Sequence, residues 1–317
     1  TFHVSPRGND AGSGSAAEPF ATPERAQAAM RKALASAPAG GSGEPTVYLR
    51  EGAWEIARSL RLTAAKVLRD GRTVVWRAWP GETPEILGSR ACSGAKPVTD
   101  PAVVGRLPPA ARGRVQELDL KAHGVTDFGT ITQRGNPGME LFVGGARMEL
   151  ARHPAEGWLR IADVPQEGPK RLHEGLEREK RFKGVPIGRH YGTIRYDGDR
   201  PAAWKSHRGI LLHGYWTWDW SDSYQTIARM DTATRTIAMA EPHHSYGYTT
   251  NQRFAFLNVL EELAAPGSWC LDREAGRLWF WPPEGWSGGE VRLSMLEEPL
   301  IVLDGCRNLR IQGFRIA

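Results

Sequence analysis

Short apolar segments dominate the first 90 residues, and turns that often contain glycine separate them. They lie at 2–4, 46–49, 53–56, 59–62, 73–76 and 85–87. From residue 46 on, only a few residues join one segment to the next, too few for the crossovers of a doubly wound parallel sheet. This rhythm predicts the stacked coils of a parallel β-helix.

One substantial helix is predicted, at 23–36. Thr22 provides the N-cap, and Pro23 occupies the first helical position, where its missing N–H costs nothing. Ala26 and Met30 belong to an apolar stripe at helical spacing.

The middle of the chain, about 115–290, has longer strands in which apolar and polar residues alternate. The predicted strands lie at 141–143, 146–148, 209–212, 215–220, 224–230, 236–239, 253–258, 268–271 and 277–281. Gly144 and Gly145 form a two-residue hairpin turn between the first two. Antiparallel hairpins at this spacing predict a β-sandwich.

The last segment, 299–316, repeats the short strands and turns of the first. We therefore predict an all-β chain, a right-handed parallel β-helix with an inserted antiparallel β-sandwich. Residues 1–114 form an N-terminal cap with one helix and the first coils, 115–290 form the inserted sandwich domain, and 291–317 resume the β-helix. A terminal coil would expose an apolar face and open strand edges, so we expect further coils after residue 317 and a chain truncated early in the β-helix.

Composition narrows the classes of partner. The chain has 317 residues and a formal charge of +5, and its charges are scattered. The densest cluster, 170–183, mixes glutamates with lysines and arginines, which is typical of a solvated helix or loop rather than a nucleic-acid footprint. The longest apolar runs are too short to span a bilayer. We expect neither a nucleic-acid partner nor a membrane span.

The cysteines bear on redox environment and localisation. Cys92, Cys270 and Cys306 are widely spaced and form no CxxC pair, so they predict no metal site. One disulfide and one free thiol stay possible.

The chain begins at Thr1, without methionine, and a strand follows at once. A mature protein whose signal peptide has been removed looks like this, as does a trimmed chain. We expect a secreted or periplasmic protein.

The segment 215–220 contains three tryptophans among small and polar residues. On a strand, Trp216, Trp218 and Trp220 would face one side and Asp219 the other. Two interpretations stay open. The indoles fill a sandwich core, or they stack on sugar rings whose hydroxyls bond to nearby carboxylates.

Two pairs of carboxylates are candidates for glycosidase chemistry. Asp219 and Asp222 point to opposite sides of a strand, which is poor geometry for an acid–base pair and favours a turn cap or a salt bridge. Of Glu261 and Glu262, one faces inward and requires a partner such as Arg253 or a lysine. That carboxylate belongs either to a structural ion pair or to the wall of a sugar cleft.

Adjacent histidines, His243 and His244, precede Tyr248 in a polar aromatic loop. With no third ligand at suitable spacing, they predict no metal site. Contact with a sugar is the better interpretation, because loops on a rigid scaffold commonly bind ligands. His153 and His213 are interpreted as satisfied structural residues.

If a substrate cleft runs beneath the sandwich, six residues are the predicted sugar contacts. They are Trp218, Asp219, His244, Tyr248, Arg253 and Glu261. The aromatic members would stack on sugar rings, and the charged members would bond to hydroxyls or to a uronate.

Motifs over nearly the whole chain resemble known families. The stretches 2–10, 19–22 and 46–52 resemble the beginning of secreted right-handed parallel β-helix proteins of the pectin-lyase-like superfamily. Further stretches resemble glycoside hydrolase family 141, and they lie at 141–145, 151–154, 213–222, 246–248, 253–254, 258–262, 266–272 and 278–282. Gly144-Gly145 departs from the Asn-Gly turn that is common there.

The resemblance implies a secreted glycoside hydrolase that cleaves a plant or microbial polysaccharide or oligosaccharide without a cofactor. It places the catalytic carboxylates on later coils, after residue 317, so it assigns no catalytic pair to this chain. Two alternatives stay open: a polysaccharide lyase of the same superfamily, which acts on a uronate-containing polymer and often uses Ca²⁺, and a non-catalytic carbohydrate-binding or adhesin β-helix. GxSxG, HExxH, P-loop and dinucleotide motifs do not occur, which disfavours nucleotide-dependent chemistry.

Overall fold

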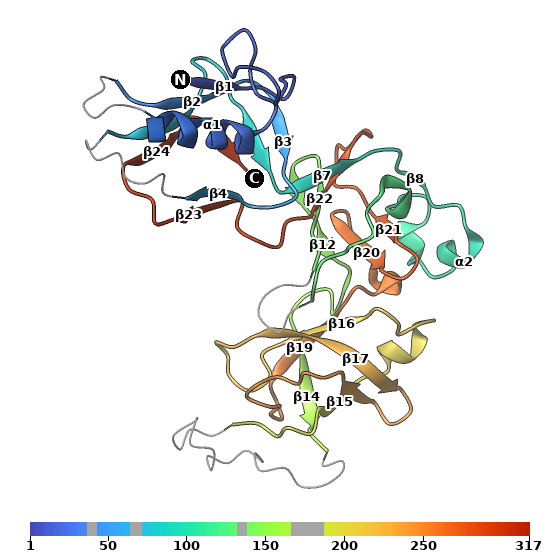
Figure 1. The fold of residues 1–317 in the computed structure, drawn as a ribbon. Helices are drawn as coiled ribbons and strands as arrows, with labels where there is room; N and C mark the ends of the chain where they lie inside the picture. Colours follow the sequence, from blue (N-terminus) through green and yellow to red (C-terminus); the bar gives the residue numbers. More distant parts are fainter. Residues whose placement is uncertain (37–42, 64–71, 132–137, 166–186) are drawn as a thin grey trace. The chain divides into compact units, whose positions relative to one another are not determined.

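The computed structural model of the 317-residue chain describes residues 1–36, 43–63, 72–131, 138–165 and 187–317. These residues divide into two compact units, unit 1 with Thr1–Arg90 and Ser294–Ala317 and unit 2 with Ala91–Leu293. Figure 1 follows the chain through both units. The charged cluster at 170–183 lies outside the described residues.

Unit 1 contains one helix and small parallel sheets. The helix α1 (Pro23–Ser36) has the predicted bounds, and Thr22 Oγ1 accepts a hydrogen bond from the Arg25 amide at 3.2 Å. The strands are β1 (Phe2–Val4), β2 (Thr46–Leu49), β3 (Ala53–Glu55), β4 (Leu60–Thr63), β5 (Val74–Ala78), β6 (Glu85–Leu87), β23 (Ile301–Asp304), β24 (Leu309–Gln312) and β25 (Arg315–Ile316). They pair in parallel in the orders β1-β2-β5-β24, β23-β4 and β25-β6-β3.

Inward-facing side chains of these strands fill one apolar core. Its buried members include Val4, Val47, Leu49, Trp54, Leu60, Trp76 and Ile86. The apolar stripe of α1 adds Ala26 and Met30 to the same core. Unit 1 therefore has a core of its own.

Unit 2 consists mainly of antiparallel strands. Outside its largest sheet the elements are β8 (Lys96–Pro97), α2 (Pro101–Val104), β9 (Gln116–Asp119), β10 (Leu141–Val143), β11 (Ala146–Arg147), β12 (Glu149–Leu150), β20 (Ser268–Asp272), β21 (Arg277–Phe280) and β22 (Val291–Ser294). The strand β7 (Ser89–Cys92) crosses the boundary between the units, as does β22 at Ser294. Short 3₁₀ helices lie at Pro109–Ala111, Lys121–His123, Arg200–Ala203 and Leu260–Glu262. Five strands form a sheet in the order β12-β20-β21-β9-β8.

The predicted hairpin turn at Gly144 and Gly145 is confirmed. It joins β10 to β11, which pair antiparallel with Val143 opposite Ala146. Both glycines have positive φ, 59° and 81°. A two-residue turn whose twist matches the strands needs such values at both central positions.

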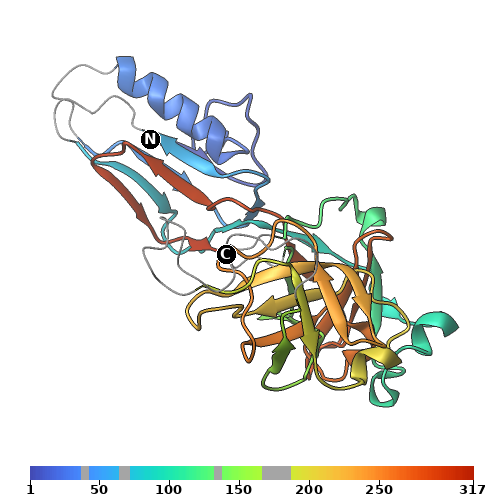
Figure 2. The ribbon, with the colours of Figure 1, turned by 90° about the horizontal axis from the view of Figure 1, so that it is seen from below.

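The largest sheet of unit 2 closes on itself. Its strands are β13 (Arg152–His153), β14 (Leu159–Asp163), β15 (Thr193–Tyr196), β16 (Leu211–Gly214), β17 (Ser223–Asp231), β18 (Thr236–Met239) and β19 (Arg253–Leu257). Their order is β13-β19-β14-β15-β18-β17-β16, and β16 also pairs with β19. Six antiparallel strands thus form a closed barrel, and Figure 2 shows them grouped together, coloured from light green to orange.

The all-β content is confirmed, but the right-handed parallel β-helix with an inserted sandwich is wrong. Within the described residues, parallel pairings form small sheets of four, two and three strands in unit 1, and β12 also pairs in parallel with β20. The largest sheet of unit 2 closes into a barrel, while the hairpins β10–β11 and β20–β21 belong to other sheets. Periodicity identifies which residues form strands, but several pairings of the same strands bury the same faces, so it does not decide which strands become neighbours.

The predicted strand at 215–220 is also wrong, because β16 ends at Gly214. Thr217 Oγ1 donates to the carbonyl oxygens of Tyr246 and Gly247 at 3.0 and 2.9 Å, which holds this segment against a neighbouring loop instead of a strand. Trp216 is fully buried, while 69% of the Trp220 surface is exposed. The three tryptophans therefore do not share a face.

Two further expectations concern covalent and membrane chemistry. Cys92, Cys270 and Cys306 are all free thiols, so no disulfide joins them. Across the described ranges, no helix combines the length and the apolar character needed to cross a bilayer.

Candidate functional site

Two of the six predicted contacts form an ion pair at the rim of the barrel. Arg253 Nη1 lies 2.7 Å from Asp219 Oδ1, and the Asp219 side chain is 70% exposed. The Arg253 guanidinium also lies over the ring of Tyr215, 4.0 Å from its centroid. Trp218, in the same loop, is half-buried. The structure thus brings Trp218, Asp219 and Arg253 to one region of the surface.

His244 and Tyr248 instead belong to the barrel interior. Tyr248 is fully buried, and its hydroxyl donates to Gln225 Oε1 at 3.0 Å and accepts from the His244 amide at 3.2 Å. His244 is only 4% exposed. Burial raises the pKa of the Tyr248 phenol and lowers the pKa of His244 to about 4. Both side chains are buried, and Nδ1 of His244 has no hydrogen-bond partner among the described residues.

Glu261 lies away from the other five, in the 3₁₀ helix Leu260–Glu262 that follows β19. Its partner is Arg106, whose Nε and Nη2 lie 2.9 and 3.2 Å from the two carboxylate oxygens, and the Lys205 amide donates at 2.9 Å. Burial by itself would raise the pKa of Glu261, but these hydrogen bonds and the charge of Arg106 lower it. The inward carboxylate has the ionic partner that burial requires, and this partner is not Arg253.

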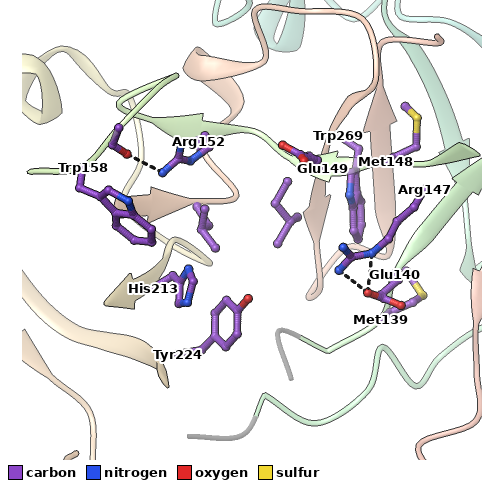
Figure 3. Close-up of a pocket in the computed structure, with 13 residues that line it drawn as sticks. Met139, Glu140, Arg147, Met148, Glu149, Arg152, Trp158, His213, Tyr224 and Trp269 are labelled. Atoms are coloured by element: carbon purple, nitrogen blue, oxygen red, sulfur yellow. Dashed lines mark hydrogen bonds and ion pairs between the residues drawn. The ribbon is translucent and has the colours of Figure 1, made fainter. Parts of the chain in front are cut away.

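A different set of residues surrounds a cavity of about 320 Å³ on the outer side of the barrel (Figure 3). The apolar part of its wall consists of Met139, Met148, Leu150, Trp158, Leu257 and Trp269. The polar part consists of Glu140, Arg147, Glu149, Arg152, His213 and Tyr224. Apolar walls with a few convergent polar groups are typical of sites for small organic ligands.

Strand alternation places His213 and Tyr224 at this cavity. Leu212 on β16 and Gln225 on β17 point inward and are buried. Because side chains alternate along a strand, their neighbours His213 and Tyr224 point outward. His213 lies directly opposite Tyr224 in the antiparallel register. The two rings stack with centroids 4.5 Å apart and an interplanar angle of 14°. The cross-strand pair therefore forms one flat, polar-edged part of the wall.

Asp222 holds the imidazole of His213 from outside the cavity lining. Its Oδ2 lies 2.8 Å from His213 Nε2. Burial, and secondarily the charge of Asp222, raises the pKa of the neighbouring Tyr224 phenol. The Tyr224 hydroxyl therefore stays protonated at neutral pH and is available as a donor.

Trp158 completes this side of the cavity. Its ring meets the edge of His213 at a centroid distance of 5.3 Å and the ring of Tyr215 at 5.5 Å. Arg152 lies over the indole at 5.4 Å, and its Nη1 and Nη2 donate to the carbonyl oxygens of Ala155 and Gly157 at 3.2 and 2.9 Å. These contacts fix the indole in the wall of the cavity.

The opposite side of the cavity, on the right in Figure 3, carries the charged groups Glu140, Arg147 and Glu149. Arg147 Nε donates to Glu140 Oε1 at 2.8 Å. Within the described residues, the Glu149 carboxylate has no hydrogen-bond or ionic partner. Across the same part of the chain, no three His, Cys, Asp or Glu side chains are grouped so that they could hold a metal ion.

None of the six predicted contacts lines this cavity. The residues that do, among them Trp158, His213 and Tyr224, come from segments that sequence spacing does not connect. Alternation along 211–214 and 223–226 does not show which way His213 and Tyr224 face, because Leu211 and Leu212 are both apolar and the polar Gln225, not Tyr224, is the buried residue of its pair. No signal in the sequence shows that the two strands pair in this register.

Comparisons with known proteins support the fold. A solved structure described as a glycoside hydrolase superimposes on the whole of this chain with a TM-score of 0.70 at 16% identity. This chain spans 50% of the length of that protein. A second structure, the complex of XylC with xylose, has 17% identity and a TM-score of 0.31, and the match covers 81% of this chain and 31% of that one. No family model matches the chain, and no curated protein matches it.

Proposed function

We propose that this chain is the carbohydrate-binding part of a glycoside hydrolase and that its cavity holds a neutral sugar. The observation that carries the proposal is the likeness in fold to a solved glycoside hydrolase, which extends over the whole of this chain. The match covers half of that protein. That this chain belongs to an enzyme with glycoside hydrolase activity is therefore itself proposed.

The chemistry of the cavity supports a sugar ligand. The indole of Trp158 lines the cavity and offers apolar surface to the C–H groups of a pyranose ring, beside the guanidinium groups of Arg152 and Arg253 that lie over the ring at 5.4 and 5.9 Å. His213, Tyr224 and Glu149 offer polar atoms that hydroxyl groups need. A cavity of about 320 Å³ accommodates one or two sugar units, since small-ligand sites begin at roughly 300 Å³.

The arginines favour a neutral sugar over a uronate. A carboxylate is bound best by a free guanidinium edge with two parallel donors. The Nη1–Nη2 edge of Arg152 is already bonded to two carbonyl oxygens, and Arg147 is bonded to Glu140. The remaining carboxylate, Glu149, would repel a uronate. These contacts favour hydrolysis of a neutral glycan over a lyase that acts on a uronate-containing polymer.

Glycoside hydrolysis requires two carboxylates that face one bond. Of the acidic residues in the cavity wall, Glu140 is paired with Arg147, and Glu149 is unpaired among the described residues. The catalytic pair that the family resemblance places after residue 317 stays a prediction. For the described residues, the proposed role is to hold the substrate.

Binding by calorimetry to neutral and uronate-containing oligosaccharides tests the proposal. We expect the neutral ligands to bind and Trp158→Ala to weaken that binding by roughly tenfold to a hundredfold, as loss of a central aromatic anchor does. The matched control is Trp220→Ala, because Trp220 is 69% exposed and lies outside the cavity wall. Equal weakening in both variants, or binding of uronates alone, would contradict the proposal.

A further inference from the structure

The tautomer of the neutral His213 ring follows from its contact with Asp222. Nε2 lies 2.8 Å from the Asp222 carboxylate, which accepts hydrogen bonds and donates none when ionised. Nε2 therefore carries the proton. A neutral imidazole has one N–H, so the other nitrogen, Nδ1, presents a lone pair.

This lone pair is open to the cavity. No described residue bonds to Nδ1, and Nδ1 is not among the buried polar atoms that lack a partner. His213 lines the cavity, and 19% of its side chain is exposed. Nδ1 is therefore a solvent-accessible hydrogen-bond acceptor in the cavity, without a donor from the described residues.

The ring is also held in one orientation. Tyr224 stacks on its face at 4.5 Å, Trp158 meets its edge at 5.3 Å, and Asp222 anchors Nε2. A polar atom fixed by three contacts loses little freedom when it binds a ligand, so it discriminates strongly between ligands. Figure 3 shows Trp158, His213 and Tyr224 together on one side of the cavity.

We infer that His213 determines specificity in this cavity: its Nδ1 accepts a hydrogen bond from one ring hydroxyl of a neutral sugar, and Asp222 fixes the tautomer that makes this possible. The inference rests on the proposed function. Beyond that function, the inference states that the site selects sugars that have a hydrogen-bond-donating hydroxyl at one particular ring position. A substituent of similar size that cannot donate, such as fluorine, is rejected there.

The test combines a change in the protein with a change in the ligand. Neutral methyl pyranosides are first screened by calorimetry, and the binder is then compared with its monofluorinated derivatives, one ring position at a time. The variant His213→Gln retains an amide that donates to Asp222 but has no acceptor at the position of Nδ1. Tyr224→Phe is the matched control, since it keeps the stacked ring and removes a different polar atom.

At one ring position, fluorine should weaken binding to the wild-type protein by about tenfold, the loss of one well-placed hydrogen bond. For His213→Gln, the same fluorine should change the affinity less than about twofold, while Tyr224→Phe should keep the wild-type discrimination at that position. A merely structural role for His213 would leave the discrimination intact in His213→Gln, and that result overturns the inference. If no methyl pyranoside binds the wild-type protein, the proposed function itself fails.

Discussion

Two clusters on the barrel contain the same residue types and have opposite roles. The interior cluster contains Trp216, His244 and Tyr248, and the cavity cluster contains Trp158 and His213 with Tyr224. In the interior, Trp216 Nε1 donates to the backbone and side chain of Ser223. In the cavity, Trp158 lines the wall, and Nδ1 of His213 has no partner among the described residues.

The difference teaches that residue type does not identify a site here. An aromatic or histidine side chain is available for binding only if its polar atoms are not already used by the protein. The decisive variable is the side of the barrel wall on which the residue lies. His213 and Leu212 are adjacent in sequence, yet Leu212 is fully buried and His213 lines the cavity.

Among variants of the two clusters, Trp216→Ala should change the stability of the protein most. Removal of a fully buried indole that also donates two hydrogen bonds should lower the free energy of unfolding by about 3–5 kcal/mol. Urea unfolding measures the change. The exposed Trp220, replaced by alanine, should shift stability by no more than about 0.5 kcal/mol. Equal losses in the two variants would show that the interior cluster is not the stabilising one.

His244 should make the interior sensitive to acid. Burial lowers its pKa from 6.5 to about 4. Between these two pH values the imidazole is protonated in the unfolded chain and neutral in the folded chain. Stability is therefore full above pH 6.5 and falls as the pH drops toward 4, by about 3 kcal/mol for this residue.

The measurement is the free energy of unfolding between pH 7.5 and 4.5. The variant His244→Gln should be less stable at neutral pH but should lose less stability on acidification than the wild-type protein. An identical pH slope in the two proteins would show that His244 does not carry the effect.

The smallest effect should come from the rim. Asp219→Asn removes the ion pair with Arg253, but Asp219 is 70% exposed, and Arg253 keeps its contact with the Tyr215 ring. We expect a loss of about 0.5 kcal/mol that disappears at high salt. Thermal melting at low and high ionic strength measures it. A loss that persisted at high salt would place this pair in the stabilising interior instead.

Local structure could largely be predicted from the sequence. The bounds of α1 and β18 and the turn at Gly144 and Gly145 follow from capping, alternation and glycine conformation, which act within a few residues. The segment after Gly214 is the exception among the strands. Its alternating pattern predicts a strand, but hydrogen bonds from Thr217 to a loop about thirty residues away hold it in another conformation.

The site required the tertiary structure. Glu261 was correctly expected to need an ionic partner when buried, because an unpaired buried carboxylate is costly. That the partner is Arg106 depends on a contact across 155 positions, which no spacing rule contains. In the same way, the cavity exists only because β16 and β17 pair with His213 opposite Tyr224 and Trp158 packs against them.

The sequence by itself determined that this chain is all-β and where most of its strands lie. These properties depend on side-chain periodicity and composition, which are local. The tertiary structure decided that unit 2 closes into a barrel, that His244 is sealed inside it, and that His213 opens outward. The reason is physical: strand pairing is a choice among many registers of similar local energy, and long-range packing of the whole chain makes that choice.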